Sequence, residues 1–127
     1  NYSGDDSMES LLYSLVTGDR KSREELDMVA ERIFMLHRAI TIRDMGSRNP
    51  RIQHDTIPDW VFSDPSGKPA FTPGTIGMDK QDMSTAMDMF YDEMGWDRKS
   101  GAPTTESYRK LGLNGVADEL AKLGLIP

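Results

Sequence analysis

The chain contains no cysteine among its 127 residues. Disulfide bonds, thiol nucleophiles and thiolate ligands for iron–sulfur clusters are therefore excluded within this sequence. Long apolar runs are also lacking, because no stretch approaches the roughly 20 residues that cross a bilayer. The polar, acidic start does not have the pattern of a signal peptide. We expect no membrane association, and we predict a cytoplasmic location, with which the lack of cysteine is compatible.

Positive charge is scarce, since 15 Lys and Arg face 21 Asp and Glu and the net charge is −6. Phosphate backbones bind to basic surfaces, so nucleic acid is excluded as a partner. Phosphate-binding glycine motifs, the serine nucleophile elbow and the twelve-residue calcium loop are missing as well. The sequence therefore predicts no catalytic residue, no cofactor-binding residue and no metal ligand.

Apolar residues recur at helical spacing without convincing strand alternation, which predicts an all-α fold of about five helices in a single domain. Ser22 and Glu25 form a capping box before the longest helix, which we expect to end before Gly46. The expected caps of the later helices are Asp79, Thr104 or Thr105, and Asn114. The predicted helices cover about residues 7–17, 23–45, 80–94, 106–111 and 115–123.

The longest predicted helix carries one apolar stripe, which we expect to face the core. Its members are Leu26, Val29, Ala30, Ile33, Leu36, His37 and Ile40. Within this stripe His37 is expected to pack in the core with a hydrogen bond. Phe34, Met35 and Ile42 lie outside the stripe, so burial on more than one side of the helix is also considered.

Residues 46–78 differ in composition from the rest, because they hold five of the seven prolines and four glycines. Long irregular segments inside a compact domain are typically functional or disordered. Trp60 and its apolar neighbours argue against disorder, since they favour docking. We predict an irregular arm that wraps across the domain surface or a neighbouring one, with one helical turn near Asp59–Phe62.

Cations gather at the start of this arm, where Arg43, Arg48 and Arg51 precede His54 and Asp55. Arginines in such a group can hold a carboxylate or phosphate, or they can anchor an irregular loop by internal ion pairs. His54 and Asp55 could act as an acid–base pair, but adjacent residues of an extended segment point in opposite directions. A structural role is therefore favoured for that pair.

The stretch from Gly95 to Leu113 is the most patterned part of the chain and reads as a tight corner between helices. Gly95 is expected to end one helix, Trp96 to pack back by burial, and Asp97 to cap the turn. Gly101 then turns the chain toward the next helix. No reactive group accompanies this pattern, so the corner is interpreted as structural.

This corner resembles the C-terminal end of the tungsten-dependent aldehyde:ferredoxin oxidoreductase family, in which a Gly-Trp-Asp corner precedes a Leu-Gly-Leu helix. Three other segments are similar in the same order. "SLVTG" (Ser14–Gly18) resembles the end of the family's preceding helix. "ERIFMLHRAITIRDMGSR" (Glu31–Arg48) resembles its long helix and Arg-rich turn. "HDTIP" (His54–Pro58) resembles its Asp-x-Leu-Pro turn.

The resemblance implies a C-terminal domain of a parent enzyme that oxidises aldehydes to acids. It implies a tungsten or molybdenum bis-pterin and a four-iron four-sulfur cluster in that parent, with upstream domains and a ferredoxin-type acceptor as partners. This chain would bind neither cofactor, would lack activity alone, and would help to form the substrate channel. Arg43, Arg48, Arg51, His54 and Asp55 are the candidate channel residues. Asn49-Pro50 and Gln53-His54, however, replace a more charged run that is usual in the family.

Two alternatives come from different classes of protein. A free-standing interaction module would present a Met-rich apolar groove on the helix from Lys80 to about Met94 to a partner helix. An independent hydrolase would rely on His54 and Asp55, but it lacks a nucleophile and a metal. An exposed apolar patch on the arm and the long helix would favour the domain of a larger enzyme.

Overall fold

The computed structural model describes residues 5, 7–62 and 79–127, which form six α-helices and one 3-10 helix. These are α1 (Met8–Thr17), α2 (Arg23–Met45), α3 (Pro50–Gln53), η1 (Asp59–Val61), α4 (Lys80–Glu93), α5 (Thr105–Lys110) and α6 (Asn114–Lys122). Within these ranges there is no named strand, and the only bridge joins Trp96 to Pro103. The predicted all-α class is confirmed.

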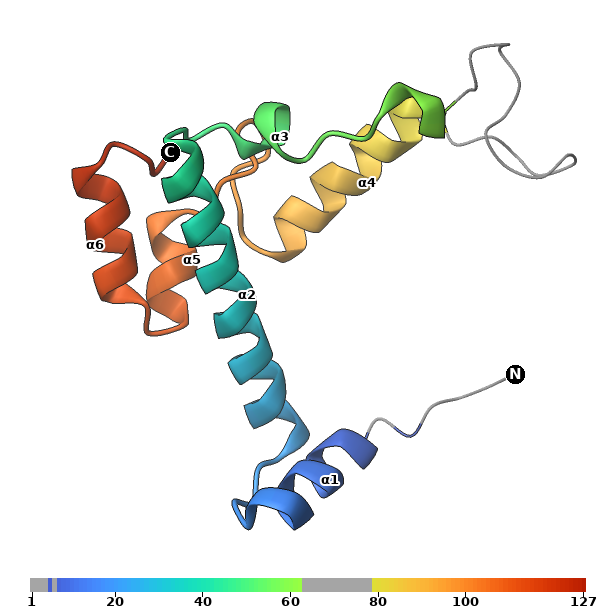
Figure 1. Cartoon of the computed structure of the whole chain (residues 1–127), viewed down its shortest axis with the longest axis vertical. Helices are drawn as coiled ribbons and strands as arrows, with labels where there is room; N and C mark the ends of the chain where they lie inside the picture. Colours follow the sequence, from blue (N-terminus) through green and yellow to red (C-terminus); the bar gives the residue numbers. More distant parts are fainter. Residues whose placement is uncertain (1–4, 6, 63–78) are drawn as a thin grey trace, which may run out of the picture.

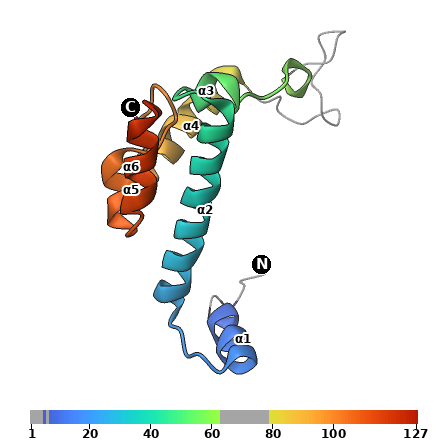
Figure 2. The same cartoon turned by 60° about the vertical axis from the view of Figure 1, so that its left-hand side comes forward.

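Helix α2 is the spine of the molecule, and its 23 residues extend for about 35 Å. Helices α5 and α6 lie beside its C-terminal half, and α1 folds back from its N-terminal end (Figures 1 and 2). Helix α4 leaves the spine on the side opposite to α5 and α6 (Figure 1). Among the described residues, no helix is both long and apolar enough to cross a membrane.

Local capping signals determine where several helices begin. Ser22 Oγ accepts a hydrogen bond from the Glu25 amide at 3.2 Å, and the Glu25 carboxylate accepts one from the Ser22 amide at 2.7 Å. Asp79 accepts from the first amides of α4, and Thr104 forms a capping box at the start of α5. These three predicted caps are confirmed, because each satisfies amides that have no partner within the helix.

The predicted cap of α6 is wrong. Asn114 is the first helical residue, and Leu113 stands before it without a side-chain cap. The Leu113 amide donates to the Tyr108 carbonyl at 2.9 Å, and the Leu113 side chain is buried. Burial of this leucine, rather than side-chain capping, therefore sets the start of α6.

One core cluster lies where the C-terminal half of α2 meets the corner, α5 and α6. Its buried members are Met35, Ala39, Ile42, Tyr91, Trp96, Ala102, Tyr108, Leu111, Leu113, Ala117, Leu120 and Leu125. All of them come from α2 or from residues 91–127. The buried core of the described residues therefore lies at the C-terminal half of α2.

The predicted orientation of α2 is wrong for most of its length. Met35 and Ile42, which lie outside the predicted stripe, are each only 1% exposed. Ile33 and Ile40 of the stripe are 53% and 47% exposed. The apolar stripe forms an exposed apolar face of α2, because α5 and α6 pack against a different face of the helix. The exposed apolar patch expected on the long helix is present.

The corner between α4 and α5 has the geometry that its sequence predicts. Gly95 has φ of +65° and Gly101 has φ of +70°, a backbone conformation that favours glycine. Asp97 accepts hydrogen bonds from the amide and the hydroxyl of Ser100 at 2.8 and 2.6 Å. The Asp97 amide in turn donates to the Ala102 carbonyl at 2.9 Å. Backbone bonds and side-chain caps together close the turn.

Trp96 fixes this corner to α2. It is only 5% exposed, and its indole N–H donates to the Met35 sulfur at 3.2 Å. The Phe34 ring lies parallel to it at a centroid distance of 5.8 Å. The predicted burial of Trp96 is confirmed.

The arm is described only as far as Phe62, and its remaining residues, 63–78, lie outside the described ranges. Its first part contains the short helix α3, which the sequence analysis missed, and the 3-10 turn expected near Asp59–Phe62 is present as η1. The Arg51 amide donates to the Ser100 carbonyl at 2.8 Å, which docks α3 on the corner. Trp60 is 62% exposed, so its predicted docking is not seen in the described contacts.

Candidate functional site

A buried ion pair between Arg38 of α2 and Asp55 lies at the centre of the polar contacts. Arg38 is 8% exposed and projects from the face of α2 that also carries Met35 and Ile42. Its two terminal nitrogens each donate to one Asp55 oxygen, one of them at 2.6 Å. One terminal nitrogen also donates to the Gly101 carbonyl at 2.6 Å. The guanidinium therefore joins the spine, the arm and the corner.

Two further side chains donate to the same carboxylate. The Tyr91 hydroxyl donates to Asp55 at 2.7 Å, and His54 Nδ1 lies 2.9 Å from the other Asp55 oxygen. Burial alone would raise the pKa of Asp55, but the hydrogen bonds from Arg38, His54 and Tyr91 and the guanidinium charge lower it to about 2. Asp55 is therefore ionised at neutral pH.

The contact between His54 and Asp55 corrects the prediction that these neighbours point apart. His54 stands at the C-terminal end of α3 with φ of −127° and ψ of −46°, which is not an extended backbone. The turn brings the imidazole and the carboxylate to the same side. The reasoning from extended geometry failed because the short helix before His54 was not recognised.

The five candidate channel residues are only partly brought together. Arg51 donates to Asp88 at 2.5 Å and to the Arg98 carbonyl at 2.7 Å, so it anchors the arm to α4 and the corner. Arg43 is exposed and pairs with its neighbour Asp44, and Arg48 is also exposed. Of the two roles predicted for these arginines, ligand binding and anchoring of the loop by internal ion pairs, Arg51 has the second.

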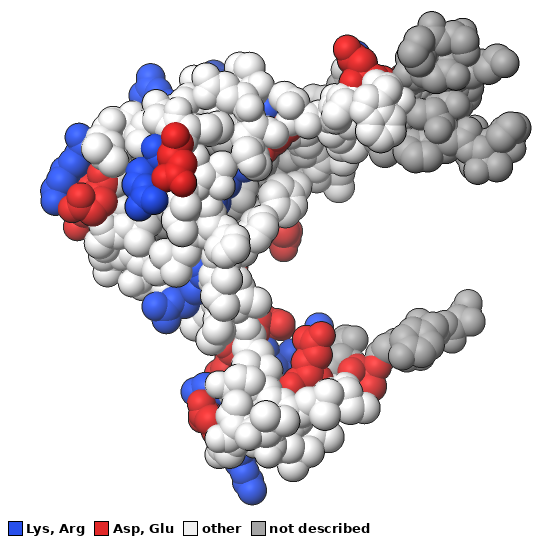
Figure 3. Space-filling view, viewed as in Figure 1, with Lys and Arg blue, Asp and Glu red and all other residues white. Residues whose placement is uncertain are grey.

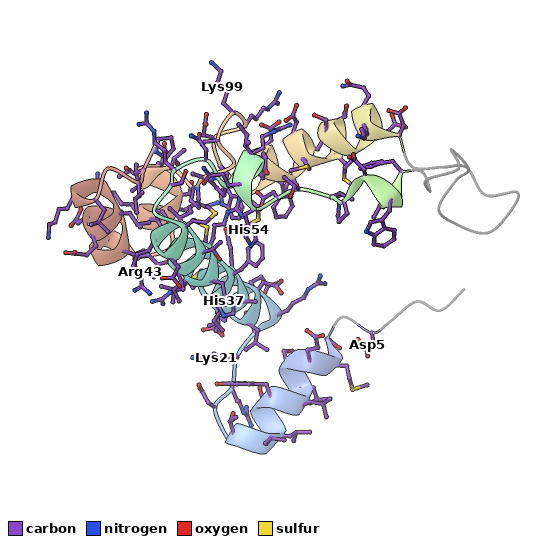
Figure 4. The ribbon with its side chains drawn as sticks, turned by 45° about the horizontal axis from the view of Figure 1, so that its top comes forward. Asp5, Lys21, His37, Arg43, His54 and Lys99 are labelled. Carbon is purple, nitrogen blue, oxygen red and sulfur yellow. The ribbon has the colours of Figure 1, made fainter. Side chains whose placement is uncertain are left out.

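A groove of about 650 Å³ opens between α2, α4 and the start of the arm. Its lining combines aromatic and apolar side chains with the Arg38–Asp55 pair and both histidines of the chain. The lining residues are Phe34, His37, Arg38, Thr41, His54, Asp55, Thr56, Ile57, Met83, Ala86, Met87, Phe90, Tyr91 and Trp96. Arg43 and Arg48 are not among them. Figure 4 labels His37 on α2 and His54 beyond the end of α3.

His37 does not have the core position predicted for it. It is exposed and faces the groove, because the side of α2 that carries it is not covered by α5 or α6. Its own carbonyl accepts a hydrogen bond from the Thr41 hydroxyl at 3.0 Å. The groove therefore presents both imidazole rings to solvent.

Sequence reasoning missed Arg38 and Tyr91, the two residues that hold Asp55. Arg38 follows Met35 by three residues and precedes Ile42 by four, so all three share one helical face. A cation on a buried face requires a buried anion, and that requirement could have drawn attention to Arg38. Burial and the bond to Asp55 raise the pKa of Tyr91, so its hydroxyl stays a donor at neutral pH.

The residues present do not fit an iron–sulfur cluster, whose iron atoms are held by cysteine thiolates. The sequence has no cysteine, and in the described part of the chain no group of three histidine, aspartate or glutamate side chains could hold a metal ion.

The fold and the groove define a helical domain built around a buried arginine–aspartate pair. Residues 1–113 match the family model described as aldehyde ferredoxin oxidoreductase, domains 2 & 3. Because this match covers most of the 127 residues, the chain belongs to the aldehyde ferredoxin oxidoreductase family. The family predicted from the corner and the three other segments is thereby confirmed. No solved structure gives a significant match.

Proposed function

We propose that this chain is the C-terminal helical domain of a larger enzyme that oxidises aldehydes to carboxylic acids. The parent would carry a tungsten or molybdenum bis-pterin and a four-iron four-sulfur cluster, and it would pass electrons to a ferredoxin-type acceptor. The observation that carries this proposal is the family match over residues 1–113. The cluster ligands belong to upstream parts of the parent, because this sequence has no cysteine.

The role of this chain in the parent is to support the cofactor domains and to border the path of the substrate. Exposed apolar side chains on α1 and α2 support the first role, because such surface is stable when another domain covers it. For the second role we assign His54 and Asp55, which line the groove. Arg51 positions them through α3, and we assign Arg43 and Arg48 no contact with substrate.

The test is expression of the intact parent gene under anaerobic conditions with tungstate or molybdate. The proposal predicts tungsten or molybdenum and iron in the purified enzyme, together with aldehyde-dependent reduction of a viologen dye. The 127-residue chain purified alone is expected to contain neither metal and to reduce no dye. An intact protein without these metals, or a 127-residue chain that turns over aldehyde, would contradict the proposal.

A free-standing interaction module remains the second candidate, because Met83 and Met87 of α4 line the groove and Met89 is 68% exposed. Methionine-rich surfaces adapt to many partner helices. The upstream coding sequence separates the two candidates. Cysteines at cluster-ligand spacing directly upstream support the enzyme domain, whereas a start codon directly before Asn1 supports the module.

A further inference from the structure

The groove presents aromatic rings to any molecule that enters it. Trp96 and Tyr91 are buried, with ring centroids 6.0 Å apart and planes 23° from parallel. Phe34 of α2 and Phe90 of α4 each contact Trp96, at centroid distances of 5.8 and 5.5 Å, and remain 46% and 44% exposed. Two partly exposed rings beside a buried indole form a surface against which a flat ring can stack or pack edge-on.

The polar end of the groove offers a hydrogen-bond acceptor of fixed orientation. His54 Nδ1 lies 2.9 Å from an Asp55 oxygen, so in the neutral imidazole Nδ1 carries the proton and Nε2 has the free lone pair. Asp55 is itself held by Arg38 and Tyr91. His54 is 53% exposed, so a ligand in the groove can reach this ring.

Several of the groove's other strong donors are already engaged, although the buried Arg38 Nε has no hydrogen-bond partner. Both terminal nitrogens of Arg38 donate to Asp55, and the Tyr91 hydroxyl does the same. The Thr41 hydroxyl donates to the His37 carbonyl. A carboxylate or phosphate would compete with Asp55 for a guanidinium that is already neutralised, so the arrangement favours an uncharged ligand that brings its own donor.

We propose that the groove binds a flat aromatic ring that carries a hydroxyl group, with the ring against Phe34 and Phe90 and the hydroxyl donating to His54 Nε2. The biological role of this binding rests on the proposed function, because in the parent enzyme the bound molecule would be the substrate, a hydroxylated aromatic aldehyde. Binding itself is a property of the groove and does not require the redox centre.

The test is an NMR titration of the 127-residue chain at pH 8, which follows the His54 ring and the Trp96 indole. The probes are p-cresol, 4-methylanisole, which keeps the ring and oxygen without the O–H, and 4-methylcyclohexanol, which keeps the hydroxyl without the flat ring. We expect p-cresol to bind about fivefold more tightly than 4-methylanisole, since one net hydrogen bond is worth about 0.5–1.5 kcal/mol. We expect a similar advantage over 4-methylcyclohexanol, since an aromatic pair is worth about 0.5–1.5 kcal/mol beyond its buried area. Trp60 is the internal control, because it does not line the groove.

Matched variants at the two histidines sharpen the result. His54→Phe keeps a ring and removes the acceptor, so p-cresol should lose its fivefold advantage over 4-methylanisole. His37→Phe makes the same change on α2 in the same groove and should alter p-cresol affinity less than twofold. Both side chains are exposed, so both variants should keep the fold, which their amide spectra verify.

Equal affinities for p-cresol and 4-methylanisole in the unmodified chain would overturn this inference. An equal loss of p-cresol affinity in His54→Phe and His37→Phe would also overturn it. Shifts confined to Trp60 would also overturn it. None of the probes contains an aldehyde, so these outcomes leave the proposed oxidation untouched. Failure of the parent to oxidise aldehydes would in turn leave the measured affinities standing.

Discussion

The two ends of this chain treat apolar side chains differently. Between the corner and the C-terminus, Ala102, Tyr108 and Leu113 are at most 7% exposed. In α1 no residue is buried, and Leu15 and Val16 are 72% and 83% exposed. The C-terminal end holds a core of its own, whereas the described residues leave α1 without a buried side chain.

The shape of the molecule fits this contrast. The limbs that carry α1 and α4 project from α2 to the same side, and the molecule is hollowed between them (Figure 3). Much of the α1 surface in that view is uncharged. Helix α1 also carries exposed apolar side chains, and monomeric proteins rarely leave a large apolar surface open to water. In the proposed parent enzyme, upstream domains would cover it.

The largest expected effect comes from the two tryptophans, of which one is buried in the corner and the other is exposed on the arm. Trp96→Ala should reduce the free energy of unfolding by about 3–5 kcal/mol, because it empties a buried site in the core. Trp60→Ala should change it by less than about 0.5 kcal/mol, because that side chain is 62% exposed. Urea denaturation measures both, and a loss below about 1 kcal/mol for Trp96→Ala would contradict the account of the corner.

A second pair of variants separates backbone strain from crowding. A Cβ on Gly101 would lie 2.8 Å from the Tyr91 hydroxyl oxygen, and φ is +70°. Gly101→Ala should therefore cost about 2–4 kcal/mol through left-handed strain and overpacking together. Gly18 has φ of +74° with nothing near its absent Cβ, so Gly18→Ala should cost only about 1–2 kcal/mol. Equal losses in thermal or urea unfolding would show that the Tyr91 contact is unimportant.

The ion pair that joins spine, arm and corner should give the next largest effect. Asp55→Asn should cost about 2–3 kcal/mol at pH 7, because it weakens charge-assisted hydrogen bonds to a buried guanidinium. The folded pKa of Asp55 is about 2, below the ordinary value of 3.8. This stabilisation is therefore present above pH 3.8 and is lost as the pH falls toward 2.

The control for that variant is Asp59→Asn, which breaks an ion pair with Lys80 that lies in solvent. We expect little change in stability from it. Unfolding curves recorded between pH 2 and 5 should show that the difference between the unmodified chain and Asp55→Asn shrinks as the solution becomes acidic. A constant difference across that range would contradict the assigned role of the carboxylate.

The smallest effect is expected on the exposed face of α2. Ile33→Ala should change the stability of the 127-residue chain by less than about 0.5–1 kcal/mol, because Ile33 is 53% exposed. Ile42→Ala on the same helix should cost about 2–5 kcal/mol, since that side chain is 1% exposed. If calorimetry showed similar losses of stability for Ile33→Ala and Ile42→Ala, the face that carries Ile33 would have to be buried within the chain itself.

Features that depend on neighbouring residues could be predicted from the sequence. The caps at Ser22, Asp79 and Thr104 and the left-handed glycines of the corner follow from local hydrogen bonds and backbone sterics. The helix α3 was missed, although Pro50 at its start is a typical first helical residue.

Features that depend on tertiary partners could not be predicted in this way. Which face of α2 is buried depends on where α5 and α6 pack, and the apolar stripe gives no information about that. The Arg38–Asp55 pair joins residues 17 positions apart, and its bond to Gly101 spans 63. Periodicity does not detect contacts over such separations. His37 was misplaced for the same reason as the stripe that contains it.

Amide hydrogen exchange, measured on the 127-residue chain and on the intact parent enzyme, tests most directly whether α1 needs outside cover. Local stability differences appear as differences in exchange protection. We predict that the Trp96 and Leu113 amides are strongly protected in both samples, whereas the Leu15 amide is at least about 100-fold better protected in the parent. A Leu15 amide that is already as well protected as Leu113 in the chain alone would contradict the account.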